Sequence, residues 1–260
     1  MNKQRTWRNL LSGVVLGIMC TLGAGSALAA GVQGVEINAT NFPDSNFRNY
    51  VSTTFDTEGT KDGVLSPTEI NQAKTIDTSG VSTFKGVEYF TALEEFYIHD
   101  CNKLTGLDLS GCTSLKTFDS AFSESLATIN LSGCTSLTTI TLNQNYVLKT
   151  LNLSDCRALK NADIHLCYGL SNLNLSNCTS LESLTVREAG GLTSLGLSNF
   201  PSLKYLNCSG DSLTGLNLSG CPALESLYCE GNGLTGLDLS SCSALEVLYC
   251  HKNQIKTLDI

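Results

Sequence analysis

The chain has 260 residues, of which 42% are hydrophobic but only 7% aromatic. This composition excludes a disordered tail, and the abundance of glycine, serine and threonine excludes a helical bundle. A formal net charge of −8 gives no electrostatic attraction to nucleic acid or anionic lipid, so neither is an expected partner.

Residues 1–29 resemble a bacterial secretory signal peptide. Three cations within the first eight residues precede an apolar run from Leu10 to Leu22, and Ala27-Leu28-Ala29 has the A-x-A pattern of a cleavage site. The apolar run is too short to span a bilayer. We therefore predict cleavage after Ala29 and an exported product, secreted or at the cell surface, that is not inserted into the membrane.

Residues 30–75 are predicted to form a small helical cap. Apolar side chains recur at helical spacing from Pro43 to Phe55, and proline suits a first turn. A second helix is expected after Ser66, because Ser66-Pro67-Thr68-Glu69 is a capping box with proline at the first helical position. Such a cap would cover the first apolar layer of the repeats that follow.

The twelve residues from Glu58 to Glu69 resemble an EF-hand calcium loop, with Gly63 at the sharp turn. The first ligand is Glu rather than Asp and the third position is Thr, whereas a start at Asp56 gives a loop two residues too long. The capping box also explains Ser66 and Glu69 without an ion, so a calcium site and a purely structural loop both stay open. The predicted calcium ligands are Glu58, Thr60, Asp62, the Val64 carbonyl, Ser66 and Glu69.

Beyond the predicted cap the sequence repeats every 21 or 22 residues. One apolar triplet recurs from Leu107-x-Leu109 to Leu258-x-Ile260, and a second series, halfway between, runs from Phe96-x-Ile98 to Leu248-x-Cys250. Each triplet predicts a short half-buried strand, with turns between. A half-repeat cannot bury its leucines alone, so the coils must stack with parallel strands ~4.8 Å apart. The expected fold over residues 76–260 is a mainly β solenoid with two parallel sheets.

Leu104–Leu115 fits the leucine-rich repeat motif LxxLxLxxN/CxL. The doubled 21-residue unit resembles repeats of exported surface proteins of Gram-positive bacteria, including internalin-like proteins. The resemblance covers roughly residues 35–260 and implies binding as the class of function. It departs at Phe200, where the N/C position is aromatic, and at Ser120 and Ala162, where strand positions lose bulk, so local irregularity is expected there. The motif returns in Leu126–Leu137, Leu170–Leu181 and Leu213–Leu224.

Eleven cysteines follow the predicted cleavage site, all at repeat positions that should face inward. Export would permit disulfides. However, in-register Cβ atoms of neighbouring coils stay ~4.8 Å apart, longer than the usual ~3.8 Å of a disulfide. We therefore predict mostly reduced structural cysteines, and no C-x-x-C pair indicates a metal site. They are Cys101, Cys112, Cys134, Cys156, Cys167, Cys178, Cys208, Cys221, Cys229, Cys242 and Cys250.

Catalytic motifs are absent from the sequence. No GxSxG, HExxH, Walker A or paired-cysteine zinc pattern occurs. The three histidines should lie at least ~14 Å apart, too far to share a metal. An outward column of Asp and Asn side chains indicates a hydrogen-bond ladder rather than paired catalytic carboxylates. We predict no catalytic residue and no required cofactor, with calcium as the single candidate ion.

The outward residues of the second strand series include Tyr228 and Tyr249 on consecutive coils, with Tyr205 on the same face and Lys252 at its rim. Exposed tyrosines beside charged groups suit contact with a protein or a glycan, although cross-strand aromatic pairs also stabilise a sheet by themselves. We predict a non-catalytic recognition module. The alternative is a rigid spacer, and because the sequence stops inside a predicted strand, a piece of a longer cell-surface protein is expected.

Overall fold

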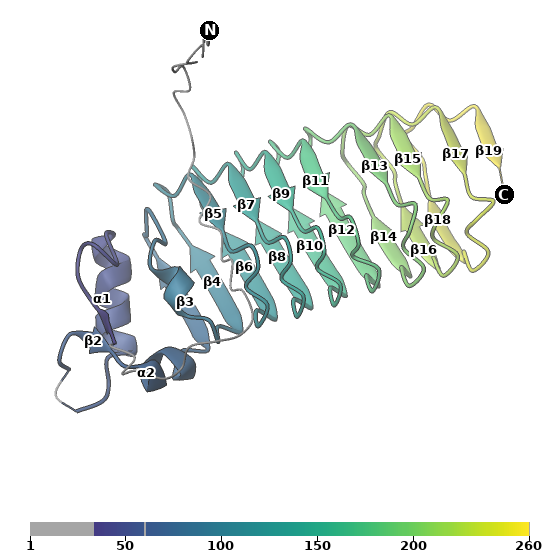
Figure 1. Ribbon diagram of the computed structural model, residues 1–260. Coiled ribbons are helices and arrows are strands. Elements are labelled where there is room, and N and C mark those ends of the chain that lie inside the picture. The colour runs from purple at the N-terminus through teal and green to yellow at the C-terminus, as the bar shows by residue number, and fades with distance from the viewer. Residues whose placement is uncertain (1–33, 60, 260) are drawn as a thin grey trace, which may run out of the picture.

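A computed structural model describes residues 34–59 and 61–259. The predicted signal peptide, residues 1–29, lies outside the described residues. Figure 1 shows an elongated stack of coils with two short helices at the end nearest the amino terminus. Within the part of the chain that is described, no helix combines the length and apolarity needed to cross a bilayer.

Two helices and a two-stranded ribbon precede the stack. α1 spans Ser45–Thr54 and α2 spans Pro67–Gln72. β1 (Val35–Glu36) pairs antiparallel with β2 (Val64–Leu65) and holds the two helical segments together. The small helical cap expected from the sequence is confirmed.

The first helix begins where the Asp44 side chain accepts hydrogen bonds from the backbone N–H groups of Asn46 and Phe47. This arrangement satisfies two amides that an uncapped helix would leave without partners. The buried Phe47 ring packs edge-on against Phe84 at 5.1 Å, and Phe84 in turn packs against Phe96 in β4 (Glu95–His99) at 5.0 Å. A chain of aromatic contacts therefore joins the cap to the solenoid core.

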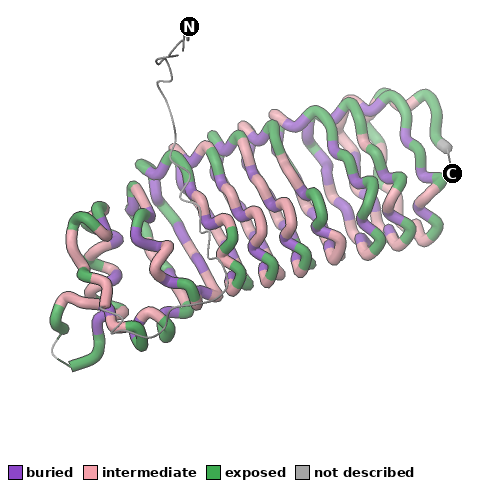
Figure 2. The backbone as a smooth tube through the Cα atoms, viewed as in Figure 1, coloured by how far each residue is buried: buried purple, intermediate pink, exposed green. Residues whose placement is uncertain are grey.

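The main sheet has nine parallel strands that follow one another in sequence order. Side chains of neighbouring coils are in register, so that Phe96, Phe118, Ile140 and Ala162 form one inward column. Figure 2 shows buried and more exposed residues alternating along the strands. The strands are β3 (Thr75–Ser79), β4 (Glu95–His99), β6 (Thr117–Ala121), β8 (Thr139–Asn143), β10 (Asn161–His165), β12 (Ser183–Arg187), β14 (Tyr205–Asn207), β16 (Ser226–Tyr228) and β18 (Val247–Tyr249).

The strands of the other series, which begins at Leu107-x-Leu109, also pair in parallel, but they form three separate sheets rather than the single sheet expected. Two strands per coil and the solenoid itself are confirmed. The first sheet has four strands and the other two have two strands each. They contain β5 (Gly106–Asp108), β7 (Thr128–Asn130), β9 (Thr150–Asn152) and β11 (Asn172–Asn174); β13 (Ser194–Gly196) and β15 (Gly215–Asn217); and β17 (Gly236–Asp238) and β19 (Thr257–Asp259). A 3₁₀ turn at Val87–Tyr89 precedes the first full coil.

The first break, between β11 and β13, lies beside Phe200. Before the break, Leu153 N–H donates to the Asn174 carbonyl at 2.8 Å, and the described residues contain no matching bond from Leu175 N–H to the Gly196 carbonyl. Phe200 fills a site that a small cysteine occupies in neighbouring coils, and a phenyl ring needs more room between coils. The irregularity expected at Phe200 is therefore found in the structure.

Buried cysteines line one corner of the coils and hydrogen-bond from coil to coil. The Cys134, Cys156 and Cys178 sulfurs lie 3.1–3.2 Å from main-chain carbonyl oxygens of the coil before, at Leu109, Leu131 and Leu153. Burial raises the pKa of Cys156 to about 11 and that of Cys178 to about 12. These sulfurs therefore stay protonated at neutral pH and donate, as small buried side chains with low reactivity.

Thiol titration checks this structural role. If the chain is denatured under anaerobic handling, most of its eleven cysteines downstream of residue 29 should react as thiols. The reason is that nine of these cysteines are buried, several of them donating to main-chain carbonyls, and low thiolate character slows oxidation. Finding most of these cysteines blocked until a reductant is added would contradict the prediction.

A second corner carries buried amide side chains. Asn145, which is fully buried, accepts from Ser123 N–H at 3.2 Å and donates to the Ser120 carbonyl at 2.8 Å. Asn232 repeats this role four coils later, because its Nδ2 donates to the carbonyls of Cys208 and Cys229. Each amide acts as both acceptor and donor, which satisfies backbone groups that the turn would otherwise leave buried and unpaired.

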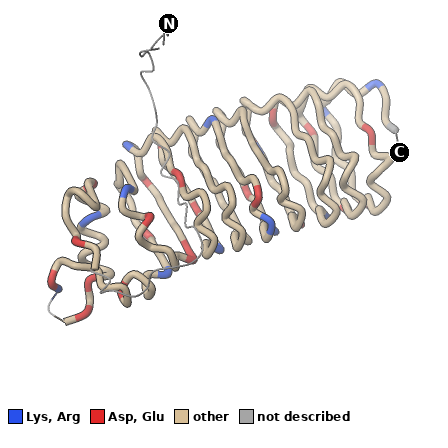
Figure 3. The backbone as a smooth tube through the Cα atoms, in the orientation of Figure 1, with Lys and Arg blue, Asp and Glu red and all other residues tan. Residues whose placement is uncertain are grey.

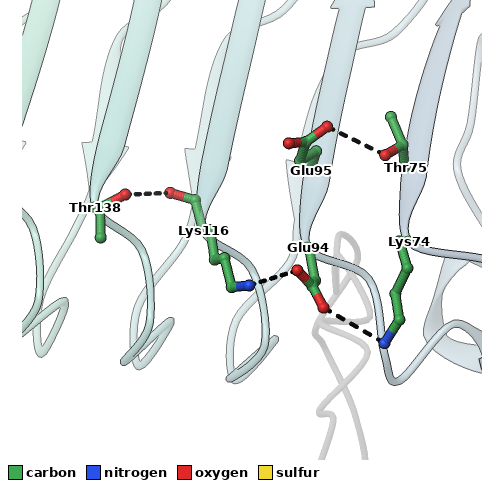
Figure 4. Close-up of polar contacts among 6 residues, drawn as sticks. All are labelled: Lys74, Thr75, Glu94, Glu95, Lys116 and Thr138. Carbon is green, nitrogen blue, oxygen red and sulfur yellow. Dashed lines mark hydrogen bonds and ion pairs between the residues drawn. The ribbon is translucent and has the colours of Figure 1, made fainter.

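Charged side chains occupy the position just before every strand of the nine-stranded sheet except β8, where Thr138 stands. Figure 4 shows Glu94 between Lys74 and Lys116, and it bonds both. Lys160 pairs with Glu182 at 3.1 Å further along the same edge. The hydrogen bond from Lys116 does most to hold the pKa of Glu94 below its ordinary value, although each exposed pair contributes little to stability.

Candidate functional site

The structure brings together the three tyrosines predicted from the sequence. Tyr228 and Tyr249 are directly opposed on β16 and β18, with ring centroids 5.0 Å apart and planes 13° apart. Tyr205 on β14 packs against Tyr228 at 5.6 Å. The Tyr249 side chain remains 50% exposed, so the stack presents one open aromatic face. Lys252, the fourth predicted residue, is exposed in the turn that follows β18.

The same outward face becomes acidic toward the cap. Asp77, Tyr97, Asp119, Thr141 and Asp163 occupy successive coils of the column that continues to Tyr228. Burial raises the pKa of Asp119. The charge of His99 acts to lower this pKa, and the charge of Asp77 acts to raise it further. Figure 3 shows that charged residues are few along the rest of the stack. The face therefore combines an acidic end with an aromatic end.

A second aromatic pair lies in the turns and was missed in the sequence. The Tyr146 and Tyr168 rings stack at 5.7 Å with planes 9° apart, and they are 37% and 50% exposed. Phe122 and Val147, also exposed, belong to the same turns of neighbouring coils. The 22-residue spacing of the two tyrosines could have predicted the pair, but both tyrosines lie in turns, outside the strand triplets that define the repeat.

The Glu69 carboxylate closes the EF-hand-like loop by accepting hydrogen bonds from its backbone. Glu69, which is 3% exposed, accepts from the backbone N–H groups of Thr57 and Glu58 through one oxygen and from Ser66 N–H through the other. Ser66 also donates its hydroxyl to Glu58 at 2.8 Å. The predicted capping box is therefore present, and the Glu69 carboxylate is occupied by three amides in this conformation.

The loop geometry favours the start at Asp56 over the start at Glu58. Asp56 is 1% exposed, and one carboxylate oxygen accepts from the backbone N–H of Gly63, the turn glycine, at 3.1 Å. Its other oxygen has no hydrogen-bond partner. Asp62 instead accepts from Val64 N–H within its own turn.

Calcium binding stays a prediction. Thr60 lies outside the described residues, and among residues 34–59 and 61–259 no three acidic, histidine or cysteine side chains converge to suit a metal. The Asp56 carboxylate is nevertheless a buried acceptor without a full set of donors, which is the kind of group that a cation would satisfy.

Two family models match the chain. Residues 42–166 match the leucine-rich repeat domain of the endo-β-N-acetylglucosaminidase EndoS, and residues 222–260 match a model of two leucine-rich repeats. No curated protein sequence matches at a significant level.

Several solved structures are similar to the chain at low identity. A functional domain of InlJ from Listeria monocytogenes, which includes a cysteine ladder, is 22% identical over 87% of this chain, with a TM-score of 0.47. The chain spans about half of that domain, since 52% of it is covered. Internalin C2 from the same organism is 20% identical, with 87% of this chain and 92% of that chain covered and a TM-score of 0.40. From the two family matches and the repeating coils, the chain belongs to the leucine-rich repeat proteins.

Proposed function

We propose that the chain is an exported, non-catalytic recognition module that binds a protein or a glycan through the outward face of its nine-stranded sheet. The observation that carries this proposal is the stack of Tyr205, Tyr228 and Tyr249 on that face, with Tyr249 half exposed. Tyrosine supplies apolar area and a polar tip with few rotatable bonds, so it gains contact energy at a low entropic cost.

The length of the sheet also supports binding. Nine strands spaced ~4.8 Å apart extend over roughly 40 Å, which is enough for a standard-size protein interface. The acidic end of the face would attract a partner with a basic patch and speed its association. A glycan belongs in the same search, because the EndoS domain matched over residues 42–166 comes from an enzyme named for acting on N-acetylglucosamine linkages.

The predicted signal peptide supports the proposed export of this module. The A-x-A pattern that ends at Ala29 would release a chain that begins just before the described cap. The resulting module would meet ligands outside the cell. We therefore place the proposed binding activity in the medium or at the cell surface.

A paired substitution tests the proposed face. The chain from residue 30 is immobilised and screened against extracellular proteins and glycans, in calcium and in chelator. Replacing Tyr228 and Tyr249 together by Ala should weaken saturable binding by about 10- to 100-fold, because aromatic anchors carry a large share of interface energy. The matched control replaces Tyr146 and Tyr168, a stacked pair of similar geometry elsewhere on the surface, and should retain binding.

Equal binding by both double variants would show that the nine-stranded sheet face is not the site. A complete absence of ligands would instead favour the rigid spacer. Thermal unfolding of each variant separates lost binding from lost folding, since stacked cross-strand rings also stabilise a sheet.

A further inference from the structure

The break between β11 and β13 opens a cleft on a different sheet from the tyrosine face. A cavity of about 340 Å³ lies between the coil of β11 and the coil of β13. Apolar side chains of Leu173, Leu195 and Phe200 form part of its lining. The polar part of the lining includes Asn174, Ser176, Asn177, Gly196, Ser198 and Asn199.

Gly196 explains why the cleft is open. In earlier coils the outward column is bridged by amides, as where Asn152 Nδ2 donates to Asn130 Oδ1 at 3.1 Å. By register, Gly196 stands in this column beside Asn217, so its coil contributes no side chain. A Cβ placed on Gly196 would meet nothing within 4 Å. The column of outward side chains is therefore interrupted at Gly196, which leaves space.

The break also leaves main-chain groups at the cleft without their usual partners. Asp155 N–H donates to the Ser176 carbonyl at 2.8 Å, but the described residues show no equivalent bond from Asn177 N–H to the Ser198 carbonyl. Both residues line the cleft. The residue that carries this amide donor, Asn177, thus lines the opening together with amide and hydroxyl side chains. Groups of this kind need hydrogen-bonding partners, either water or a ligand.

The lining selects for a neutral, hydroxylated ligand. None of the residues that line the cleft is charged, so it offers no counter-charge to a phosphate, a carboxylate or a cation. Amide and hydroxyl groups next to apolar side chains match the alternating hydroxyl and C–H surfaces of a sugar ring. We propose that this cleft binds a neutral saccharide of one or two rings, at a site separate from the tyrosine face.

The test uses the full chain with two neutral disaccharides, cellobiose and N,N′-diacetylchitobiose, titrated by calorimetry and by NMR. At least one should bind saturably in the millimolar range. Gly196→Asn extends the amide column into the cleft and should weaken that binding by about tenfold or more. Thr128→Asn adds the same side chain on β7 of the same strand series, away from the cleft, and should leave binding unchanged.

Two results would overturn the proposal. One is the absence of saturable binding of either disaccharide to the unmodified chain. The other is binding to Gly196→Asn that equals binding to the unmodified chain. If Gly196→Asn does not fold, as judged by its melting transition, Asn199→Ala serves in its place, because Asn199 is an exposed cleft residue whose loss removes one donor and one acceptor. Unchanged binding by that variant would equally count against the site.

Discussion

Replacing Asp211 by Asn is expected to stabilise the protein at neutral pH by roughly 2–3 kcal/mol. Asp211 is only 8% exposed and accepts from Ala189 N–H at 2.6 Å through one oxygen, while its other oxygen has no partner. Asn145 and Asn232 hold equivalent positions in other coils, where the amide nitrogen donates to main-chain carbonyls. An ionised carboxylate cannot donate, so Asp211 is the mismatched member of this column.

The effect should depend on pH. Burial raises the pKa of Asp211 to about 7. The hydrogen bond from the Ala189 N–H and the positive charge of Arg187 act to lower this pKa, whereas the negative charge of Glu188 acts to raise it. Because the pKa is higher in the folded than in the unfolded state, folding is favoured most below about pH 4, where both states are protonated. Stability should then fall as the pH rises from about 4 to about 7 and level off above that.

Urea unfolding at several pH values between about 4 and 8 measures this dependence. The advantage of Asp211→Asn should be small at pH 4 and grow to its full size near pH 7. Asp238→Asn is the matched control: Asp238 is exposed and its pKa is lowered by hydrogen bonds from Ser240, so no gain is expected at neutral pH. An advantage of the same size at both ends of the range would contradict the titration argument.

Replacing Glu69 by Ala is expected to destabilise the cap by about 3 kcal/mol. The Glu69 carboxylate accepts three backbone N–H groups, and its removal leaves them without acceptors in a partly buried loop. Burial acts to raise the pKa of Glu69, but the bonds from Glu58, Ser66 and Thr57 outweigh it and hold the pKa below its ordinary value. The stability that Glu69 supplies is thus present above the ordinary pKa and is lost as the pH falls through the lowered one.

Thermal unfolding in chelator and in millimolar calcium separates the two interpretations of this loop. A Tm that rises with calcium, and a rise that Glu69→Ala abolishes, would support the EF-hand interpretation. An equal Tm in both conditions would mean that the hydrogen bonds of the Glu69 carboxylate stabilise the loop without an ion. Glu124→Ala is a suitable control, because Glu124 is exposed and lies in a turn of the solenoid, outside the predicted calcium loop.

The fold could be predicted because the period of the sequence is also the period of the structure. Once Leu107 and Ile129 are known to be equivalent, their pairing on adjacent strands follows. The break at Phe200 could be placed but not described, since the way a ring fits between coils depends on packing. The place of Asp211 in the column of buried turn residues was not predicted, although Asp211 stands 22 residues after Ala189. The reason is that this column was recognised by its Cys and Asn residues. Whether the Glu69 carboxylate binds an ion or accepts three backbone N–H groups depends on the path of the loop, which no sequence motif specifies.

The charges that alternate before most strands of the nine-stranded sheet discriminate among pairings of nearly identical coils. In the native order Lys74 faces Glu94, Glu94 faces Lys116, and Lys160 faces Glu182. If a folding chain skipped one coil, leucine would still meet leucine in the core, so the hydrophobic pattern alone would tolerate the error. The charges would not, because like would meet like and repel. The like-charged pairs formed by such a skip are Lys74 with Lys116, Lys116 with Lys160, Lys160 with Lys204, and Glu182 with Glu225. The last coils lack this discrimination, because Glu225 and Glu246 are neighbours in the native order and a skip would bring Lys204 to Glu246.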